Sequence, residues 1–156
     1  MSKKVYTIEE IKRKLEHYCV YQDRCHQEVE KKLYDYALIV EAREHILLHL
    51  LEHNFLNEER FSKSFARGKF RIKKWGKLRI VRELRQRNIS AYNIRTALKE
   101  IDDEDYINTL YAIVGHKSET INESNIYKKK KKIIDHLRYR GYETDVIFKA
   151  VNETVK

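Results

Sequence analysis

The chain contains two similar segments, IVRELRQRNISAYNIRTAL (Ile80–Leu98) and IIDHLRYRGYETDVIFKAV (Ile133–Val151), which align without a gap at an offset of 53 residues. The alignment pairs apolar positions with apolar positions and sets Asn88 opposite Gly141. Asn and Gly are the residue types that most readily adopt the left-handed backbone conformation that ends a helix. Each segment therefore predicts a helix, a tight turn and a second helix, and their repetition indicates a repeat protein.

An amphipathic segment precedes each of these helix pairs, Asn57 to Arg67 before the first and Asp102 to Val114 before the second. Asn57 and Asp102 are suitable N-caps, and the acidic residues that follow them suit the first turn of a helix. The repeating unit should therefore contain three helices. Upstream, apolar residues at helical spacing predict a third, more divergent unit with helices over Thr7 to Val20, Cys25 to Tyr36 and Glu41 to His53.

These patterns predict an all-α fold, built as an elongated, curved array of three tandem three-helix repeats. We place the divergent unit at residues 1–54, the second at 55–100 and the third at 101–156. The absence of Pro and the presence of only four Gly in 156 residues argue against an all-β fold, which needs many tight turns. The polar segment Lys117 to Asn125 should form a loop.

The composition fits a globular domain, because 42% of the residues are hydrophobic and 11 Tyr and 5 Phe are present. No apolar run approaches the roughly 20 residues of a membrane span, and the first residues lack the apolar stretch of a secretion signal. We therefore expect a cytoplasmic protein without a membrane segment. Its two cysteines, Cys19 and Cys25, should then be reduced thiols.

Positive charge is concentrated in two blocks of the sequence. The chain has 33 Lys plus Arg against 24 Asp plus Glu, a net charge of +9. From Lys63 to Arg87 eleven basic residues stand against one acid, and from Lys128 to Arg140 seven stand against one. Such blocks predict a polyanionic partner, although basic helix faces can also simply be solvated. Phe70, Trp75 and Tyr127 lie among the charges and are either core residues or platforms for unpaired bases.

The motifs of common catalytic and metal sites are missing. The Gly68–Leu78 segment is no phosphate-binding loop, because Arg71 stands where the first Gly is needed and Leu78 where Ser or Thr would hold magnesium. His45, His49 and His53 have a spacing that could hold zinc, but they flank an apolar stripe and fit interfacial or solvated side chains better. We therefore expect no cofactor and no enzymatic activity, and leave the histidine triplet open.

A further pattern runs from Leu50 to Leu98, through Leu56, Asn57, Arg60, Phe61 and Ala66 and then Gly76, Ile80, Leu84, Arg87 and Ile89. In the order and spacing of these residues the chain resembles the middle of the bacterial RecX regulatory proteins. Asp23 and Arg24 extend the resemblance into the first unit, and Leu137, Arg140, Gly141 and Tyr142 extend it into the third. Cys25 departs from the pattern, which usually has Ser there, so the second helix has a weaker cap for which Asp23 is a possible substitute.

The resemblance implies a regulator of the bacterial recombinase RecA that acts in DNA repair, recombination and the SOS response. Such a regulator binds the filament that RecA forms on single-stranded DNA and restrains its ATPase, strand-exchange and co-protease activities. Chosen by charge, the candidate contacts to this filament are Lys69, Arg71, Lys73, Lys74, Lys77, Arg79, Arg82, Lys128, Lys129, Lys130, Arg138 and Arg140. We expect the protein to act as a monomer.

Two alternative functions remain open at this point. A helix, tight turn and helix also describe a helix-turn-helix DNA reader, which would act independently of recombinase. A helical-repeat adaptor that binds an acidic protein is the other possibility, and it predicts no affinity for DNA.

Overall fold

The computed structural model describes residues 5–156, and within this range the chain forms nine α-helices and no strand. The helices are α1 (Ile8–Tyr21), α2 (His26–Leu33), α3 (Val40–Glu52), α4 (Glu58–Arg71), α5 (Lys77–Gln86), α6 (Ala91–Leu98), α7 (Asp103–Thr120), α8 (Ile126–Arg140) and α9 (Thr144–Thr154).

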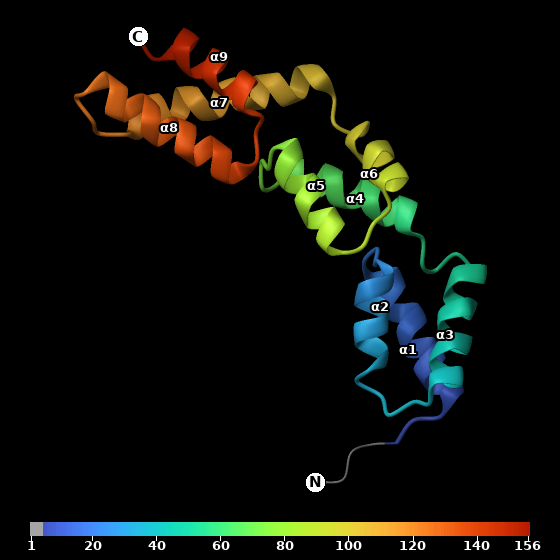
Figure 1. The fold of residues 1–156 in the computed structure, drawn as a ribbon. Coiled ribbons are helices and arrows are strands. Elements are labelled where there is room, and N and C mark those ends of the chain that lie inside the picture. Colours follow the sequence, from blue (N-terminus) through green and yellow to red (C-terminus); the bar gives the residue numbers. More distant parts are fainter. Residues whose placement is uncertain (1–4) are drawn as a thin grey trace.

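The helices pack most closely within three consecutive groups, α1–α3, α4–α6 and α7–α9. Figure 1 shows these groups following one another along a bent path, with the two ends of the chain at opposite ends of the molecule. The predicted all-α fold, a curved array of three three-helix repeats, is therefore confirmed. The unit boundaries at 54/55 and 100/101 stay a proposal, and each falls in the connection between two groups.

The predicted caps and turns explain where the helices begin and end. The side chains of Asn57 and Asp102 accept hydrogen bonds from the backbone N–H groups three residues later, as expected for N-caps. The equivalent turns of the two aligned segments both use a left-handed residue, Asn88 with φ 59° and Gly141 with φ 95°. The internal alignment thus identified turn chemistry that recurs in the structure.

Two segments are more helical than the sequence indicated. α7 continues through Thr120, so the loop predicted from Lys117 to Asn125 begins only at Ile121. Ile121, which follows the last turn of α7, is partly buried against the apolar core and anchors this end of the helix, which the polar composition of the segment conceals. α4 likewise continues past Arg67 to Arg71, which brings Phe70 into the core with 7% of its surface exposed.

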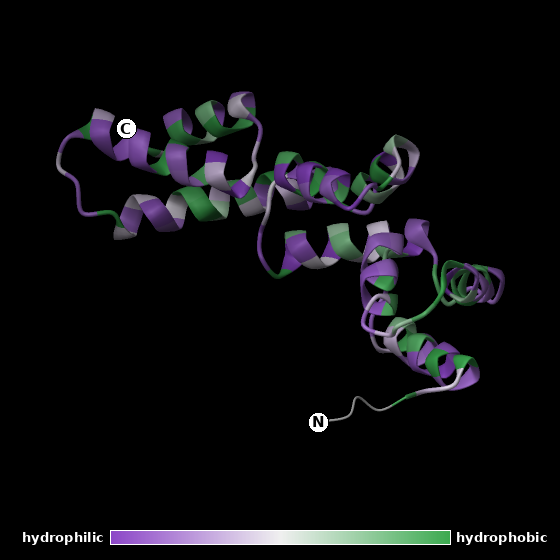
Figure 2. Ribbon diagram, turned by 60° about the horizontal axis from the view of Figure 1, so that its bottom comes forward, coloured by the Kyte–Doolittle hydropathy of each residue, from purple (hydrophilic) through white to green (hydrophobic). Residues whose placement is uncertain are grey.

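The buried apolar residues form two separate cores. One core belongs to α1–α3 and includes Leu56, while the other runs without interruption through α4–α9 and includes Cys25. Figure 2 shows hydrophobic and hydrophilic residues alternating along the helices, which is the pattern that allows each group to bury one face. Among the described residues no helix is long and apolar enough to cross a membrane.

Candidate functional site

The contact between the second and third groups of helices, here called the second junction, is made by backbone against backbone. The N–H of Gly76 donates to the carbonyl of Arg140 at 2.8 Å, and the N–H of Leu78 donates to the carbonyl of Gly141 at 2.9 Å. A Cβ atom at Gly76 would lie 2.3 Å from the carbonyl carbon of Gly141. The start of α5 can therefore approach the end of α8 only because both positions are glycine.

Two buried tyrosines complete the second junction. The hydroxyl of Tyr106 accepts a hydrogen bond from the N–H of Lys77 at 3.0 Å and donates one to Glu143, while Tyr142 donates to the carbonyl of Lys74 at 2.8 Å. Their rings lie 5.2 Å apart. Burial raises the pKa of Tyr142 to about 12 and raises the pKa of Tyr106 still more strongly, so both hydroxyls stay protonated as donors.

The second junction also brings together part of the first block of candidate contacts, around the loop between α4 and α5. Lys73 and Lys74 are exposed in this loop. Arg140, from the second block, donates to the carbonyl of Lys73 at 2.5 Å. The guanidinium of Arg79 lies 4.2 Å from the ring centre of Trp75 and 5.0 Å from that of Tyr139 on α8. Cations separated by more than sixty residues in sequence thus share one surface.

The aromatic residues among these charges differ in their surroundings. Phe70 is buried against Tyr106, with ring centres 5.8 Å apart, and is a core residue. Trp75 is half-buried beside the core, with the ammonium of Lys69 5.0 Å from its ring centre. Tyr127 is 81% exposed at the start of α8. Phe70 is therefore ruled out as a platform for bases, whereas Trp75 belongs both to the core edge and to the cationic surface.

The remaining candidates are more scattered. Lys77 forms an ion pair with Asp103 at 3.4 Å, and Arg82 is exposed one turn beyond Arg79. The end of α4 carries Lys69 and Arg71. The start of α8 carries Lys128, Lys129 and Lys130, whereas Arg138 lies near the end of that helix, over the ring of Phe148. The eleven residues from Lys130 to Arg140 span about 15 Å of helix, so the second block is divided between two ends of α8.

The charge of the chain is therefore concentrated in its middle. Residues 55–100 carry 14 basic and four acidic residues, a net charge of +10. Residues 1–54 carry nine basic and ten acidic residues, and residues 101–156 carry ten of each. The lysines of α8 are largely balanced by acids elsewhere in the same group, for example Lys131 by Asp135 and Lys132 by Glu123. The α4–α6 group is thus the principal cationic element.

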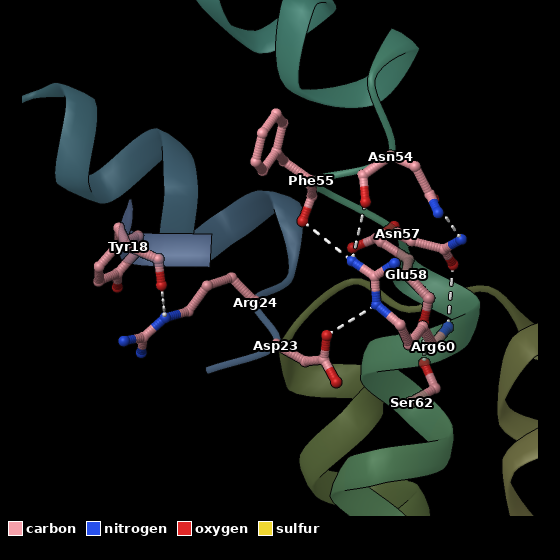
Figure 3. A network of polar contacts seen from close by, with 9 residues as sticks. All are labelled: Tyr18, Asp23, Arg24, Asn54, Phe55, Asn57, Glu58, Arg60 and Ser62. Carbon is pink, nitrogen blue, oxygen red and sulfur yellow. Dashed lines mark hydrogen bonds and ion pairs between the residues drawn. The ribbon is translucent and has the colours of Figure 1, made fainter. Parts of the chain in front are cut away.

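The contact between the first and second groups, here called the first junction, depends on Arg60 of α4. Its Nε donates to Asp23 at 2.8 Å, and its Nη2 donates to the carbonyls of Asn54 and Phe55 at 3.1 and 3.0 Å, as Figure 3 shows. The sequence marked Arg60 and Asp23 only as matches to a family pattern. Their pairing across 37 residues could not be read from spacing.

The first junction also supplies the missing cap of α2. Cys25 stands at the N-cap position and its side chain caps no backbone N–H, and Asp23 does not replace it because it binds Arg60. Instead the N–H of His26 donates to the carboxylate of Glu58 on α4, at 3.1 Å. Burial raises the pKa of the Cys25 thiol to about 11, and both cysteines are free and buried.

The histidine triplet of α3 has a structural explanation. His49 lies 2.7 Å from the carboxylate of Glu16 on α1 and packs edge-on against His53, while His45 is exposed. Within residues 5–156 no group of three or more His, Cys, Asp or Glu side chains is arranged to hold a metal ion.

Comparison with known families now places the chain. The family model of the second three-helix domain of RecX matches residues 57–98, and that of the third matches residues 103–151. Together they account for more than half of the sequence. The chain belongs to the RecX family. RecX proteins are regulatory proteins by description, and the matched segments are the two helix groups that meet at the second junction.

Individual relatives agree with this assignment. The regulatory protein RecX of Lactobacillus gasseri is 27% identical over 129 residues, covering 83% of this chain and 48% of the relative. That of Clostridioides difficile is 26% identical over 111 residues, covering 70% of this chain and 52% of the relative. The chain thus spans about half the length of these curated relatives.

Solved structures show the same fold at low sequence identity. The crystal structure of RecX from Lactobacillus salivarius is similar to 94% of this chain with a TM-score of 0.82 and 20% identity, covering 96% of that structure. A second crystal structure of a regulatory protein RecX gives the same TM-score at 19% identity and is covered over 73% of its length.

Proposed function

We propose that this protein regulates the RecA recombinase by binding the filament that RecA forms on single-stranded DNA, and that it restrains the ATPase, strand-exchange and co-protease activities of the filament. Membership of a regulatory family supports the proposal. The observation that carries it is the concentration of a net +10 charge on the middle helix group of a bent, extended molecule.

The shape and charge of the molecule suit this partner. A nucleoprotein filament offers DNA phosphates and repeated protein surfaces along one axis, and an array of helix groups can contact several of them at once. Lys69, Lys73, Lys74 and Arg79 would lie at the centre of such a contact, with Arg140 joining them across the second junction. Lys128, Lys129 and Lys130 would form a separate, outer contact on α8. In this role the protein acts in the cytoplasm, as a monomer and without catalysis.

ATP hydrolysis by RecA on single-stranded DNA tests the proposal. The protein at a stoichiometric level should lower the hydrolysis rate, and an unchanged rate would contradict the assignment. A protein that leaves RecA unaffected but prefers one duplex sequence would instead be an independent helix-turn-helix reader. An adaptor for an acidic protein would bind no DNA.

Charge-reversal variants test the surface separately from the function. Lys73→Glu with Lys74→Glu should raise the concentration needed for inhibition about tenfold, since like charges would then face the phosphates. Arg13→Glu with Lys31→Glu makes the same charge change at exposed positions of the first helix group and should have little effect. Lys128→Glu with Lys129→Glu measures the outer contact. Equal inhibition by all three double variants would place the interface elsewhere.

A further inference from the structure

A groove of about 690 Å³ lies beside the second junction, between the end of α4, one face of α7 and the end of α8. Along α7 its wall is formed by four successive turns, from Asp105 to Lys117. These thirteen residues span about 18 Å of helix. Opposite them stand Phe70 and Arg71 of α4, Lys74 of the following loop, and His136 and Arg140 of α8.

The cations of this groove are not neutralised by internal ion pairs. Within the described residues Arg71, Lys74, Lys117 and Arg140 form no ion pair with a carboxylate, and Asp105 is the one acid on the groove wall. Four positive charges held close together repel one another, and an anionic ligand would relieve that repulsion. Burial and the charges of Lys117 and Arg140 lower the pKa of His136, as expected where a neighbouring anion is lacking.

The middle of the groove is different in character. Ala112 and Ile113 of α7 form a short apolar floor beside the largely buried Phe70. Asn108 and Thr109 offer amide and hydroxyl groups one turn away. Such a floor can support one planar base, and the polar groups can bond to its edge. The cations lie where phosphates on either side of that base would run.

We infer that this groove binds a short stretch of single-stranded nucleic acid, with phosphates on Arg71, Lys74, Lys117 and Arg140 and a base on the apolar floor of Ala112 and Ile113. A stacked strand carries one phosphate per roughly 3.4 Å, so an 18 Å groove matches about five phosphates. The inference deepens the proposed function and rests on it for its setting, because it names the part of the chain that meets the DNA of the filament.

An acidic protein segment fits the groove less well. The walls are helices whose backbone groups are already paired, so an extended peptide would find no sheet edge with which to form backbone hydrogen bonds. An amphipathic helix would need an apolar floor several turns long, whereas the apolar part here is one turn of α7 and Phe70. Guanidinium and ammonium groups placed along an open channel are the usual arrangement for a phosphate backbone.

The test uses the purified chain and a fluorescein-labelled oligo(dT) of twelve nucleotides, with fluorescence anisotropy at 50 mM salt. Arg71→Glu with Lys117→Glu should weaken binding at least about tenfold and reduce the slope of log affinity against log salt by about 1.4. Ala112→Trp fills the groove from an exposed position without a change of charge and should also weaken binding about tenfold. The matched control, Lys31→Glu with Lys149→Glu, has the same net charge as the first variant but leaves the groove intact.

Three results would overturn the inference. The first is no binding of oligo(dT) by the wild-type chain, and the second is equal affinity for the groove variants and the control, with helicity confirmed by circular dichroism. The third is competition by free dTMP as effective as by unlabelled oligonucleotide, which would make the groove a mononucleotide site. Because RecA is absent from this assay, its outcome is independent of the ATPase result, and failure of one proposal can be told from failure of the other.

Discussion

The two junctions join similar helix groups by different means. At the second junction, backbone N–H groups of Gly76 and Leu78 bond directly to carbonyls at the end of α8, and one apolar core continues across the contact. At the first junction, the bonds come from side chains, chiefly Arg60 and Glu58, and the apolar core is interrupted. Backbone contacts between close-packed elements leave the two elements little freedom to move relative to each other. Long polar side chains, by contrast, can rearrange and lose only part of their interaction energy.

This difference indicates which parts of the molecule move together. The α4–α9 segment should behave as one rigid body that carries the cationic surface and the groove. The α1–α3 group, which has a net charge near zero and its own core, should open from it at a lower free energy. In the role proposed above, the protein could then adjust its bend at the first junction while its charged surface keeps a fixed shape.

The largest expected effect is the loss of the backbone contact at the second junction. Gly76 has φ −76° and ψ 166°, a conformation open to any residue, so Gly76→Ala acts only through its Cβ, which would lie 2.3 Å from the Gly141 carbonyl. The start of α5 and the end of α8 must then move apart, and we expect the free energy of unfolding to fall by about 3 kcal/mol or more. Urea denaturation followed by circular dichroism measures the change.

Gly68→Ala is the matched control for this prediction. Gly68 lies within α4, and a Cβ there would meet nothing within 4 Å. The substitution should therefore stabilise the protein by about 0.5–1 kcal/mol through the better helix propensity of Ala. Similar effects of the two substitutions would show that the junction does not depend on close approach of the backbone.

A smaller effect is expected from breaking the first junction. Arg60→Ala removes three hydrogen bonds at the end of α1–α3, and with the side chain 38% exposed we expect a cost of about 1–2 kcal/mol. Arg67→Ala is the matched control, because Arg67 lies on the same helix and is 40% exposed but pairs with Glu100 within its own helix group. This substitution should lower the free energy of unfolding by only about 0.5 kcal/mol.

Hydrogen exchange of single amides shows where the Arg60 variant opens. The N–H of His26 donates across the first junction, and those of Gly76 and Leu78 donate across the second. Arg60→Ala should speed exchange at His26 and leave Gly76 and Leu78 protected. Equal acceleration at all three amides would mean that the two junctions open as a single unit, contrary to the comparison.

The sequence predicted the repeats but not the contacts between them. The alignment of Asn88 with Gly141 depends on local backbone chemistry, and local chemistry is what a sequence pattern records. The contact of Gly76 with Gly141 joins positions 65 residues apart, and nothing in either glycine's surroundings in the sequence specifies its partner. The side-chain contact between Arg60 and Asp23 likewise joins distant positions that no local pattern pairs. The cap of α2 is also distant, because Glu58 of α4 does what a capping residue at the position of Cys25 would normally do.

Charge alone predicted the cationic surface in part. Within the block from Lys63 to Arg87, Lys69 and Arg79 come together because both lie against Trp75 in the loop between α4 and α5. The block from Lys128 to Arg140 looks equally dense in sequence but is stretched along a helix and balanced by acids such as Asp135 and Glu123. Counting basic residues without their acidic neighbours in three dimensions therefore overestimated the second block. Lys117, which lines the groove, lay in a segment that was expected to be a loop.

The smallest expected effect is a dependence of the second junction on pH through His136. Burial and the charges of Lys117 and Arg140 lower the pKa of this imidazole in the folded protein, so the unfolded chain binds its proton more readily, with a pKa near 6.5. The stabilisation due to His136 is therefore complete above pH 6.5 and is lost as the pH falls below it towards the pKa of the folded state.

His136→Gln should remove this part of the pH dependence, measured as the change in unfolding free energy between pH 7.5 and 5.5. Lys117→Gln should reduce it, because one of the two repelling charges is gone, whereas Lys31→Gln, at an exposed site of the first group, should not. A wild-type pH profile that is identical in His136→Gln would show that the groove cations do not act on this imidazole.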